Sequence, residues 1–241
     1  MNLFPFFQSS NPIKVDIHSH LLPGIDDGVK SIEETVKIIK RFQILGYDKL
    51  ITTPHIISDS YPNNRQIITK KLYEVREALQ ENNIDIILEA SAEYYLDMEF
   101  LEIIEKDELI PFMHHYILFE TSYQAKPIIL EHAIALIIKK GFIPVMAHPE
   151  RYIYLHHDIK LYKELKLQGV LFQVNIKSLH NRHKSVYKIA VKLINLGLVD
   201  FMGSDVHRMS DMVKLEKIIQ SNLYRSINKK NTLLNNQKST N

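Results

Sequence analysis

The chain has 241 residues, of which 45% are hydrophobic and 24% are charged, as is typical of a soluble globular enzyme and unlike a disordered chain. It contains no cysteine, which excludes disulfides, iron–sulfur clusters, thiolate zinc sites and a cysteine nucleophile. The net charge is +2, and residues 223–241 carry four of the 30 basic residues and no acidic ones. The rest of the chain therefore lacks the clustered basic footprint of a nucleic-acid-binding surface, and we expect no nucleic-acid partner.

Apolar runs are too short to cross a membrane. The longest, residues 128–138, is interrupted by Glu131 and His132, so we expect no membrane insertion. Residues 1–12 have neither a basic n-region nor a small-residue cleavage site, so we expect no signal peptide and a cytoplasmic protein. The apolar side chains of this N-terminal extension must pack on the base of the fold or on a second subunit of a homo-oligomer: Leu3, Phe4, Phe6 and Phe7.

Apolar, β-rich runs followed by helical patterns recur seven times along the chain. The runs are Lys14–His18, Lys49–Thr53, Asp85–Ala90, Tyr116–Glu120, Phe142–Ala147, Val170–Val174 and Asp200–Gly203. Near-continuous apolar strands are typical of a parallel sheet that is covered on both faces. Alternating strands and helices predict an α/β fold with right-handed crossovers, either a closed (β/α) barrel or an open doubly wound sheet.

The helices between these runs carry start and stop signals. Residues 31–45 begin with a capping box formed by Ser31 and Glu34 and end before Gly46. Pro127 opens a second helix that ends at Lys140. Helical patterns also cover residues 67–80, 161–168 and 209–221, and a further helix ends at Asn195–Gly197. We expect one domain over residues 1–222 and a polar tail, residues 223–241, that frays.

Residues of the types that bind metals lie at the ends of six of the seven runs. They are His18, His20, Asp26, Asp27, His55, Glu93, Glu120, His148, Asp205 and His207. The sixth run ends instead with the weaker ligands Gln173 and Asn175. Because the carboxyl ends of parallel strands meet on one rim, we expect these side chains to share a pocket. So many acids are costly to desolvate without cations, and mixed imidazole and carboxylate ligands suit more than one Mn, Fe or Zn ion.

Each of these motifs, taken alone, also has a structural interpretation. His18 and His20 share one face of a strand and could form a satisfied core pair, and residues 26–28 could form a simple turn. Glu93 could cap a helix, and Glu120 could pair with a lysine. His148 and the proline after it could simply end a strand, and Asp205 and His207 could cap the following helix. Coincidence at six of the seven strand ends favours a metal site.

Seven motifs, in order, resemble the PHP-domain (polymerase and histidinol phosphatase) superfamily over about residues 13–210. They are Val15–His20, Gly24–Gly28, Ser31–Glu34, Thr52–His55, Ala92–Tyr95, Ala147–Tyr152 and Gly203–His207. Within that superfamily, the Ile-Asp-Asp-Gly loop and the His-Pro-Glu-Arg motif are similar to those of the bacterial manganese-dependent tyrosine-protein phosphatases of capsule and exopolysaccharide operons.

The resemblance implies a distorted seven-stranded, TIM-like (β/α) barrel with three divalent metal ions, Mn²⁺ in preference to Fe or Zn, at the C-terminal ends of the strands. The implied ligand sets are His18, His20, Glu93 and Asp205 for one ion, Glu93, Glu120 and His148 for a second, and Asp27, His55 and His207 for a third. Arg151 would clamp the phosphate. Relatives carry a further phosphate-binding arginine several residues beyond the Asp-x-His motif, whereas here the nearby arginine is Arg208, directly after His207.

Without cysteine, phosphoester hydrolysis in this chain has to be metal-assisted. A hydroxide that bridges two metal ions is a nucleophile at neutral pH and would attack phosphorus in line, without a phosphoenzyme. The fork of Arg151 would stabilise charge on the equatorial oxygens, unless Arg151 forms a surface ion pair with Glu150 instead. A tyrosine leaving group has a pKa near 10 and needs little acid catalysis, which His55 or a metal-bound water could provide.

The implied substrate is a tyrosine-phosphorylated protein, the tyrosine-rich tail of a polysaccharide-export tyrosine kinase. Tyr61 and Tyr123 lie in strand-end loops and could accommodate a phenyl ring. One alternative is a small-molecule phosphatase such as a histidinol phosphatase. Another is a metal-stabilised interaction module without catalytic activity.

Overall fold

Short parallel strands surrounded by helices make up the computed structural model, which describes residues 13–156 and 158–236. The strands are β1 (Val15–Asp16), β2 (Lys49–Thr52), β3 (His55–Ile56), β4 (Ile87–Ala90), β5 (Glu93–Tyr95), β6 (Tyr116–Glu120), β7 (Ile143–Ala147), β8 (Leu171–Asn175) and β9 (Phe201–Gly203). The α-helices are α1 (Ile32–Ile44), α2 (Arg65–Glu81), α3 (Met98–Glu105), α4 (Leu130–Lys139), α5 (Ile159–Leu167), α6 (Ser185–Asn195), α7 (Met209–Ile219) and α8 (Asn222–Lys230). Three 3₁₀ helices, η1 (Pro149–Arg151), η2 (Ile153–Leu155) and η3 (Ile176–Leu179), follow β7 and β8.

The strands form two parallel sheets, with the orders β1-β2-β4 and β3-β5-β6-β7-β8-β9. All seven predicted runs contain a strand, but β3 and β5 lie beyond the predicted runs. Pro54, which has no N–H to donate, separates β2 from β3, and Ser91 and Ala92 separate β4 from β5. The sequence therefore predicts the α/β class and the parallel pairing correctly, while the single continuous seven-stranded sheet is replaced by two.

The first and last strands approach each other just beyond their ends. Ser19 and Val206 form an isolated parallel bridge. The amide of His20 donates to the carbonyl of Val206 at 2.9 Å, and the amide of Asp205 donates to the carbonyl of His18 at 2.7 Å. This pairing places two predicted ligand pairs, one from each end of the chain, beside each other.

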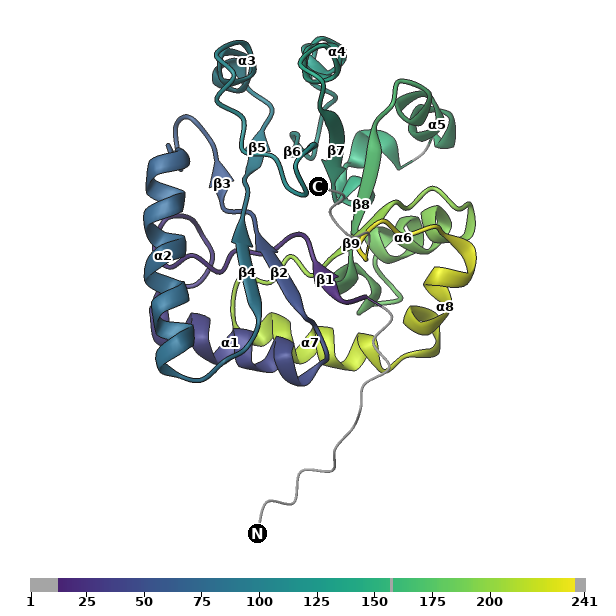
Figure 1. Cartoon of the computed structure of the whole chain (residues 1–241). Helices are drawn as coiled ribbons and strands as arrows, with labels where there is room; N and C mark the ends of the chain where they lie inside the picture. Colours follow the sequence, from purple (N-terminus) through teal and green to yellow (C-terminus); the bar gives the residue numbers. More distant parts are fainter. Residues whose placement is uncertain (1–12, 157, 237–241) are drawn as a thin grey trace.

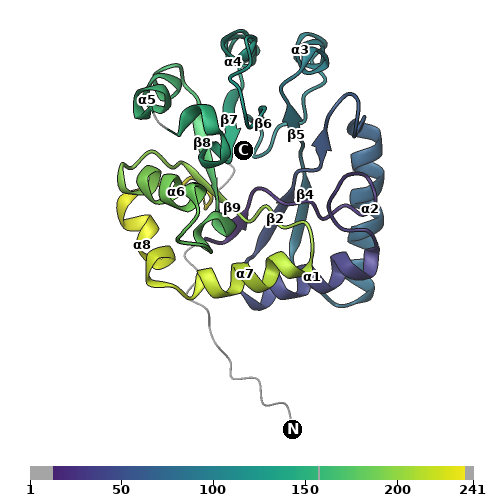
Figure 2. The same cartoon turned by 180° about the vertical axis from the view of Figure 1, so that it is seen from behind.

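The helices lie on the outside of the strands, with α1 and α7 next to each other along one side (Figures 1 and 2). The main hydrophobic cluster includes side chains from both layers, among them Ile38 of α1, Leu50 of β2, Phe172 of β8 and Leu215 of α7. The predicted cap of α1 is confirmed, because the Ser31 hydroxyl accepts from the amide of Glu34. Helix α4 begins at Leu130, later than the predicted Pro127, and the sequence analysis did not predict α3.

The expectation that residues 223–241 fray is wrong for the part that the structure describes. Residues 222–230 form helix α8, whose side chains Tyr224 and Ile227 are buried. Further along, the amide of Asn235 donates to the carbonyls of Val15 and Met202 and its oxygen accepts from the Met202 N–H. A polar side chain thus attaches this segment to β1 and β9 through hydrogen bonds that hydrophobic periodicity does not reveal.

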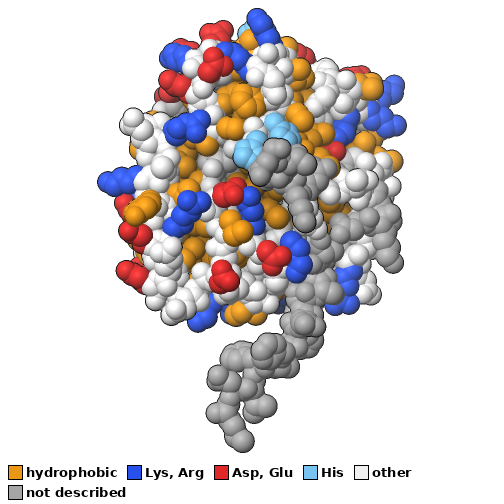
Figure 3. Space-filling model, viewed as in Figure 1, with side chains coloured by type: hydrophobic (Ala, Val, Ile, Leu, Met, Phe, Trp, Pro, Cys, Tyr) orange, Lys and Arg blue, Asp and Glu red, His pale blue; other side chains and the backbone are white. Residues whose placement is uncertain are grey.

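On the face shown in Figure 3, basic and acidic side chains are interspersed among apolar ones. No helix within residues 13–156 and 158–236 has the length and apolar character needed to cross a bilayer. The predicted packing of the N-terminal extension, residues 1–12, lies outside the described residues.

We expect Asn235→Ala to lower the free energy of unfolding by about 1–3 kcal/mol, because it removes the side-chain partner of three backbone groups, two of them buried and one half-buried. The measurement is urea denaturation followed by circular dichroism. Asn222→Ala, at an exposed position of the same terminal helix, is the matched control and should change stability little. Equal stability of the two variants would contradict the buried attachment of the C-terminal segment.

Candidate metal centre

All nine predicted metal ligands lie in one contiguous cluster. They form four overlapping groups, and within each group the candidate ligand atoms all lie within 4.8 Å of one another. The groups are His20, Asp27, His55 and His207; His18, His20 and Asp205; His18, Glu93 and His148; and His55, Glu93 and Glu120. Strand ends far apart in the sequence thus converge, as expected for the carboxyl edge of a parallel α/β fold.

The deepest group contains His18, His20 and Asp205, all fully or almost fully buried. The Nε2 atoms of the two histidines are 3.3 Å apart, and Asp205 Oδ1 lies 3.9 Å from His18 Nε2 and 3.7 Å from His20 Nε2. These atoms face a common point at distances too long for good hydrogen bonds to the carboxylate.

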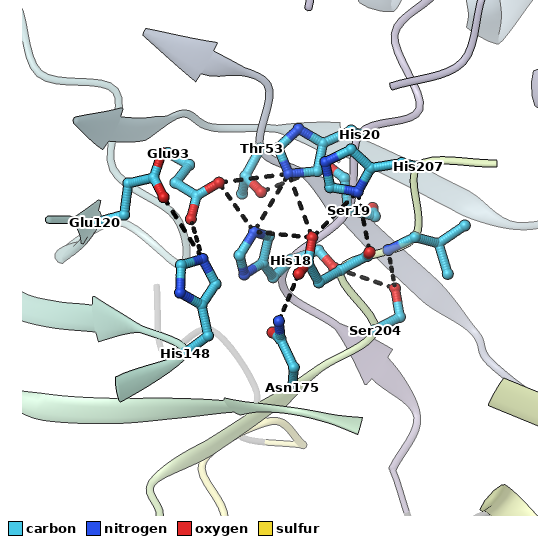
Figure 4. A network of polar contacts seen from close by, with 12 residues as sticks. His18, Ser19, His20, Thr53, Glu93, Glu120, His148, Asn175, Ser204 and His207 are labelled. Atoms are coloured by element: carbon cyan, nitrogen blue, oxygen red, sulfur yellow. Dashed lines mark hydrogen bonds and ion pairs between the residues drawn. The ribbon is translucent and has the colours of Figure 1, made fainter. Parts of the chain in front are cut away.

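Glu93 lies at the junction of the groups and is itself buried. Its oxygens lie 3.2 Å from His18 Nε2, 3.2 Å from His55 Nδ1 and 2.9 Å from His148 Nε2. The parallel register that pairs His55 with Glu93 brings β3 and β5 side by side at this point. Figure 4 shows Glu93 between the imidazoles, with Glu120 pointing at His148.

The outer group is closer to solvent. Asp27 Oδ1 lies 3.5 Å from His55 Nε2 and 3.3 Å from His207 Nε2, and the Asp27 side chain is half exposed. The Ile-Asp-Asp-Gly loop places this carboxylate over the histidines. The cluster therefore extends from the buried interior to the surface.

Outer hydrogen bonds orient three of the imidazoles. His20 Nδ1 pairs with Asp26 Oδ2 at 2.8 Å, His18 Nδ1 with Gln173 Oε1 at 2.7 Å, and His207 Nδ1 with the Asp205 carbonyl at 3.1 Å. In each ring Nδ1 is the donor to an oxygen, so Nε2 is left to face the other ligands. Metal-binding histidines are typically held in this way.

Protonation states of the buried groups fit a cation at this place. Burial, together with the charge of Glu93, raises the pKa of Glu120 well above its ordinary value. Burial, together with the Arg151 guanidinium, lowers the pKa of His148 to about 4, so this imidazole is neutral at pH 7. Burial would also raise the pKa of Glu93, but the surrounding histidines hold it well below its ordinary value. Burial would lower the pKa values of His20 and His207, but neighbouring carboxylates, Asp26 and Asp205 among them, raise both. A neutral imidazole such as His148 beside carboxylates that repel each other is a donor that suits a divalent metal ion.

One nitrogen supports this directly. His55 Nδ1 is buried without a hydrogen-bond partner among the described residues, although it lies 3.2 Å from Glu93 Oε2 and 3.3 Å from Glu120 Oε1. A donor atom that faces two carboxylate oxygens without hydrogen-bonding to them is suited to coordinating a shared cation.

Backbone strain occurs at two of the ligands. Asp205 has φ 51° and His148 has φ 36°, both in the left-handed region that non-glycine residues rarely adopt. Such conformations are retained where the surroundings impose them, often at functional sites. Here they accompany the turns that follow β9 and β7.

A pocket of about 340 Å³ opens over the cluster. Its lining includes six of the nine predicted ligands, Asp27, His55, Glu93, His148, Asp205 and His207, together with Tyr123 and Arg151. The Arg151 guanidinium lies 4.5 Å from the centre of the Tyr123 ring, and its Nη1 lies 3.5 Å from Asp205 Oδ2.

The alternative pairing of Arg151 with Glu150 is not observed. Glu150 is buried and accepts from the main-chain N–H of Asn175 and from the Ser178 hydroxyl. Its burial, despite these hydrogen bonds, raises its pKa to about 7. Arg151 is thus directed toward Asp205 and the pocket.

Two other basic residues, Arg208 and Lys177, line the pocket. Arg208, the predicted second phosphate ligand, is exposed and occupies the N-cap position of α7 at the pocket rim. Lys177, which the sequence analysis did not single out, lines the same pocket and lies 2.9 Å from Asp205 Oδ2. Its only sequence signal is its place just after the sixth run, which ends in the weak ligands Gln173 and Asn175.

Comparison with known proteins agrees with this geometry. The model of a family described as "Capsular polysaccharide synthesis, CpsB/CapC" matches residues 14–238. The chain belongs to the CpsB/CapC family. The tyrosine-protein phosphatase CpsB of Streptococcus pneumoniae is 30% identical over 203 residues, 81% of this chain and 83% of its own length. The tyrosine-protein phosphatase YwqE of Bacillus subtilis is 26% identical over 197 residues, 81% of this chain and 78% of its own length.

Solved structures support the fold of this CpsB/CapC family member. A crystal structure from work on YwqE of B. subtilis and CpsB of S. pneumoniae, described as metal-dependent tyrosine phosphatases, superposes with a TM-score of 0.79 at 24% identity. It covers 89% of this chain and 91% of the other. An organophosphorus hydrolase variant from Deinococcus radiodurans reaches a TM-score of 0.50 at 10% identity, covering 92% of this chain and 88% of its own. The α/β fold is shared with both.

We expect Glu93→Gln to remove most of the divalent metal that the wild-type chain retains, because Glu93 belongs to two of the four ligand groups and its charge faces four imidazoles. Metal content per chain after desalting, measured by plasma mass spectrometry, checks this. Glu89→Gln, which changes a surface partner of Lys49, is the matched control and should retain wild-type metal content. Unchanged metal content in Glu93→Gln would rule out this cluster as the metal centre.

Proposed function

We propose that this protein is a divalent-metal-dependent protein-tyrosine phosphatase. The observation that carries the proposal is the convergence of nine imidazole and carboxylate ligands at a pocket whose wall holds Arg151. The names of the family relatives support phosphotyrosine as the substrate. The absence of cysteine excludes the cysteinyl-phosphate route that other tyrosine phosphatases use.

Three ions are proposed, with Mn²⁺ preferred over Fe or Zn because mixed imidazole and carboxylate ligands suit it. The proposed sets are His18, His20, Glu93 and Asp205; Glu93, Glu120 and His148; and Asp27, His55 and His207. The ligand groups in the structure overlap these sets and support them. When bound, such ions supply a hydroxide nucleophile at neutral pH and neutralise phosphoryl charge. We also propose that the two sheets act together as one distorted, closed seven-segment barrel around this centre.

Arg151 is proposed to bind the phosphoryl group. A guanidinium has five N–H groups, and the contact of Arg151 Nη1 with Asp205 accounts for one of them. Burial alone would lower its pKa, but Asp205 and neighbouring groups raise it, so the charge is permanent. Stacking on Tyr123 restricts the side chain, so it is oriented toward the pocket before substrate arrives.

His55 is proposed as a metal ligand more than as a proton donor. Burial lowers its pKa, so the imidazole is neutral at pH 7. Its two ring nitrogens already face carboxylates, Asp27 on one side and Glu93 with Glu120 on the other. A tyrosine leaving group, with a pKa near 10, can depart with a proton from water.

The proposed substrate is the tyrosine-rich tail of a polysaccharide-export tyrosine kinase, in the cytoplasm. The family description, capsular polysaccharide synthesis, supports this pathway. Two tyrosines could receive a phenyl ring beside the phosphoryl group: Tyr61 stacks on His55 with 5.8 Å between ring centroids, and Tyr123 lines the pocket.

Phosphate release is the experiment that tests the function. Manganese-reconstituted protein is assayed on a phosphotyrosine peptide, a phosphoserine peptide and histidinol phosphate, each with and without chelator. We expect chelator-sensitive turnover with at least about tenfold preference for phosphotyrosine, since the ions supply the nucleophile. A preference for histidinol phosphate would show that the enzyme is a small-molecule phosphatase and not a protein-tyrosine phosphatase. Metal binding without turnover of any of the three substrates would indicate a non-catalytic module.

We expect Arg151→Gln to lower kcat/KM for the phosphotyrosine peptide by about 100-fold, because the variant loses a charged, bidentate donor to the equatorial oxygens. Arg182→Gln, in an exposed loop, should leave kcat/KM unchanged. Metal content should stay at the wild-type value in both variants. A similar loss of kcat/KM in Arg182→Gln, or no loss in Arg151→Gln, would contradict the proposal that Arg151 binds the phosphoryl group.

A further inference from the structure

Lys177 lies in η3, directly after β8, and its side chain reaches back to the ligand Asp205. Its ammonium donates to the Asp205 carbonyl and lies 2.9 Å from Asp205 Oδ2. The side chain is 24% exposed and lines the pocket above the metal centre. A buried metal ligand thus has a pocket-facing lysine attached to it.

The two oxygens of Asp205 face different groups. Oδ1 lies 3.2 Å from His207 Nδ1 and within 4 Å of His18 and His20, on the side of the proposed metal ligands. Oδ2 faces the other donors: the side-chain amide of Asn175, Lys177 Nζ and Arg151 Nη1. This carboxylate therefore separates the imidazole cluster from two basic side chains, Lys177 and Arg151.

Lys177 and Arg151 are close enough to act on one small anion, because a nitrogen of each lies within 3.5 Å of the same oxygen atom. An ammonium has three N–H donors, and the two contacts with Asp205 account for two of them. Both side chains therefore keep donors for a ligand in the pocket. A phosphate monoester, with two negative charges and three terminal oxygens, matches two adjacent cations.

The other basic residues of the pocket are less suited to this role. Lys214 pairs with Asp211 at 3.0 Å, away from the Asp205 carboxylate, and its side chain is 44% exposed. Arg208 is exposed, and no side-chain contact to the metal ligands is found for it among the described residues. Lys177 is the one that shares an oxygen with Arg151.

We propose that Lys177 is the second phosphate-binding cation of this site and that, with Arg151, it grips the phosphoryl group of the substrate. The proposal rests on the phosphatase function proposed above. It assigns to a lysine that follows β8 the role that the sequence resemblance implied for an arginine near Arg208. Arg208 is then a rim residue without a direct part in phosphate binding.

Lys177→Gln tests the proposal in the manganese-loaded, full-length protein. We expect KM for the phosphotyrosine peptide and the Kd of inorganic phosphate, measured by calorimetry, both to rise about 10- to 100-fold, the loss expected for one charged hydrogen bond. Lys177→Arg keeps the charge and should restore most of the phosphate affinity. Arg208→Gln and Lys214→Gln, at the other basic residues of the pocket, should weaken phosphate binding less than Lys177→Gln. Arg182→Gln, in an exposed loop, is the control that should bind phosphate like the wild type.

Metal content distinguishes phosphate binding from a structural role. If Lys177 only positions Asp205, Lys177→Gln loses manganese while the phosphate Kd of the remaining loaded protein is unchanged, which overturns the proposal. A larger effect in Arg208→Gln than in Lys177→Gln also overturns it. Wild-type protein that binds phosphate through Lys177 but hydrolyses no phosphotyrosine would leave the binding site standing and remove the proposed function.

Discussion

The pairing between the first and last strands determines where the predicted metal ligands lie. Ser19 and Val206 face each other in a parallel bridge, and two main-chain hydrogen bonds hold their neighbours together. In an extended chain the residues on either side of a bridged residue point to the same side. The His-x-His spacing around Ser19 places His18 and His20 together in this way. Asp205 and His207 flank Val206 and lie beside them because of the bridge, although Asp205 is left-handed and not extended.

Such a concentration of ligands constrains the backbone around it. A Cβ at Gly203 would lie 2.6 Å from Gln173 Nε2 and 2.7 Å from His18 Cβ, so the glycine makes room for the hydrogen bond that orients His18. At Gly28 a Cβ would lie 2.3 Å from the carbonyl of His20. The backbone of Asp205 is constrained as well, because it has a left-handed conformation. In this position one carboxylate oxygen of Asp205 faces the imidazoles and the other faces Lys177 and Arg151.

The clustering of the predicted ligands follows from the sequence because residue type and strand end coincide, and the parallel topology brings the strand ends together. The sequence did not predict the short strands β3 and β5. Their paired residues include His55 with Glu93, and such polar pairs give no apolar run that would reveal a strand. The C-terminal segment was missed for a related reason. Asn235 is buried through hydrogen bonds to β1 and β9, and an asparagine in a polar stretch looks the same in a sequence whether it is buried or solvated.

Lys177 was beyond sequence reasoning because its position depends on a residue 28 places later. Its electrostatic consequence is general. Two basic side chains, Lys177 and Arg151, would lie next to the proposed divalent ions, with the single carboxylate of Asp205 between them. Cations on both sides of one carboxylate repel each other across it, and an anion that enters the pocket relieves that repulsion. A module that only stored metal would gain nothing from these two cations, whereas a site that binds a phosphoryl dianion is stabilised by them each time substrate enters.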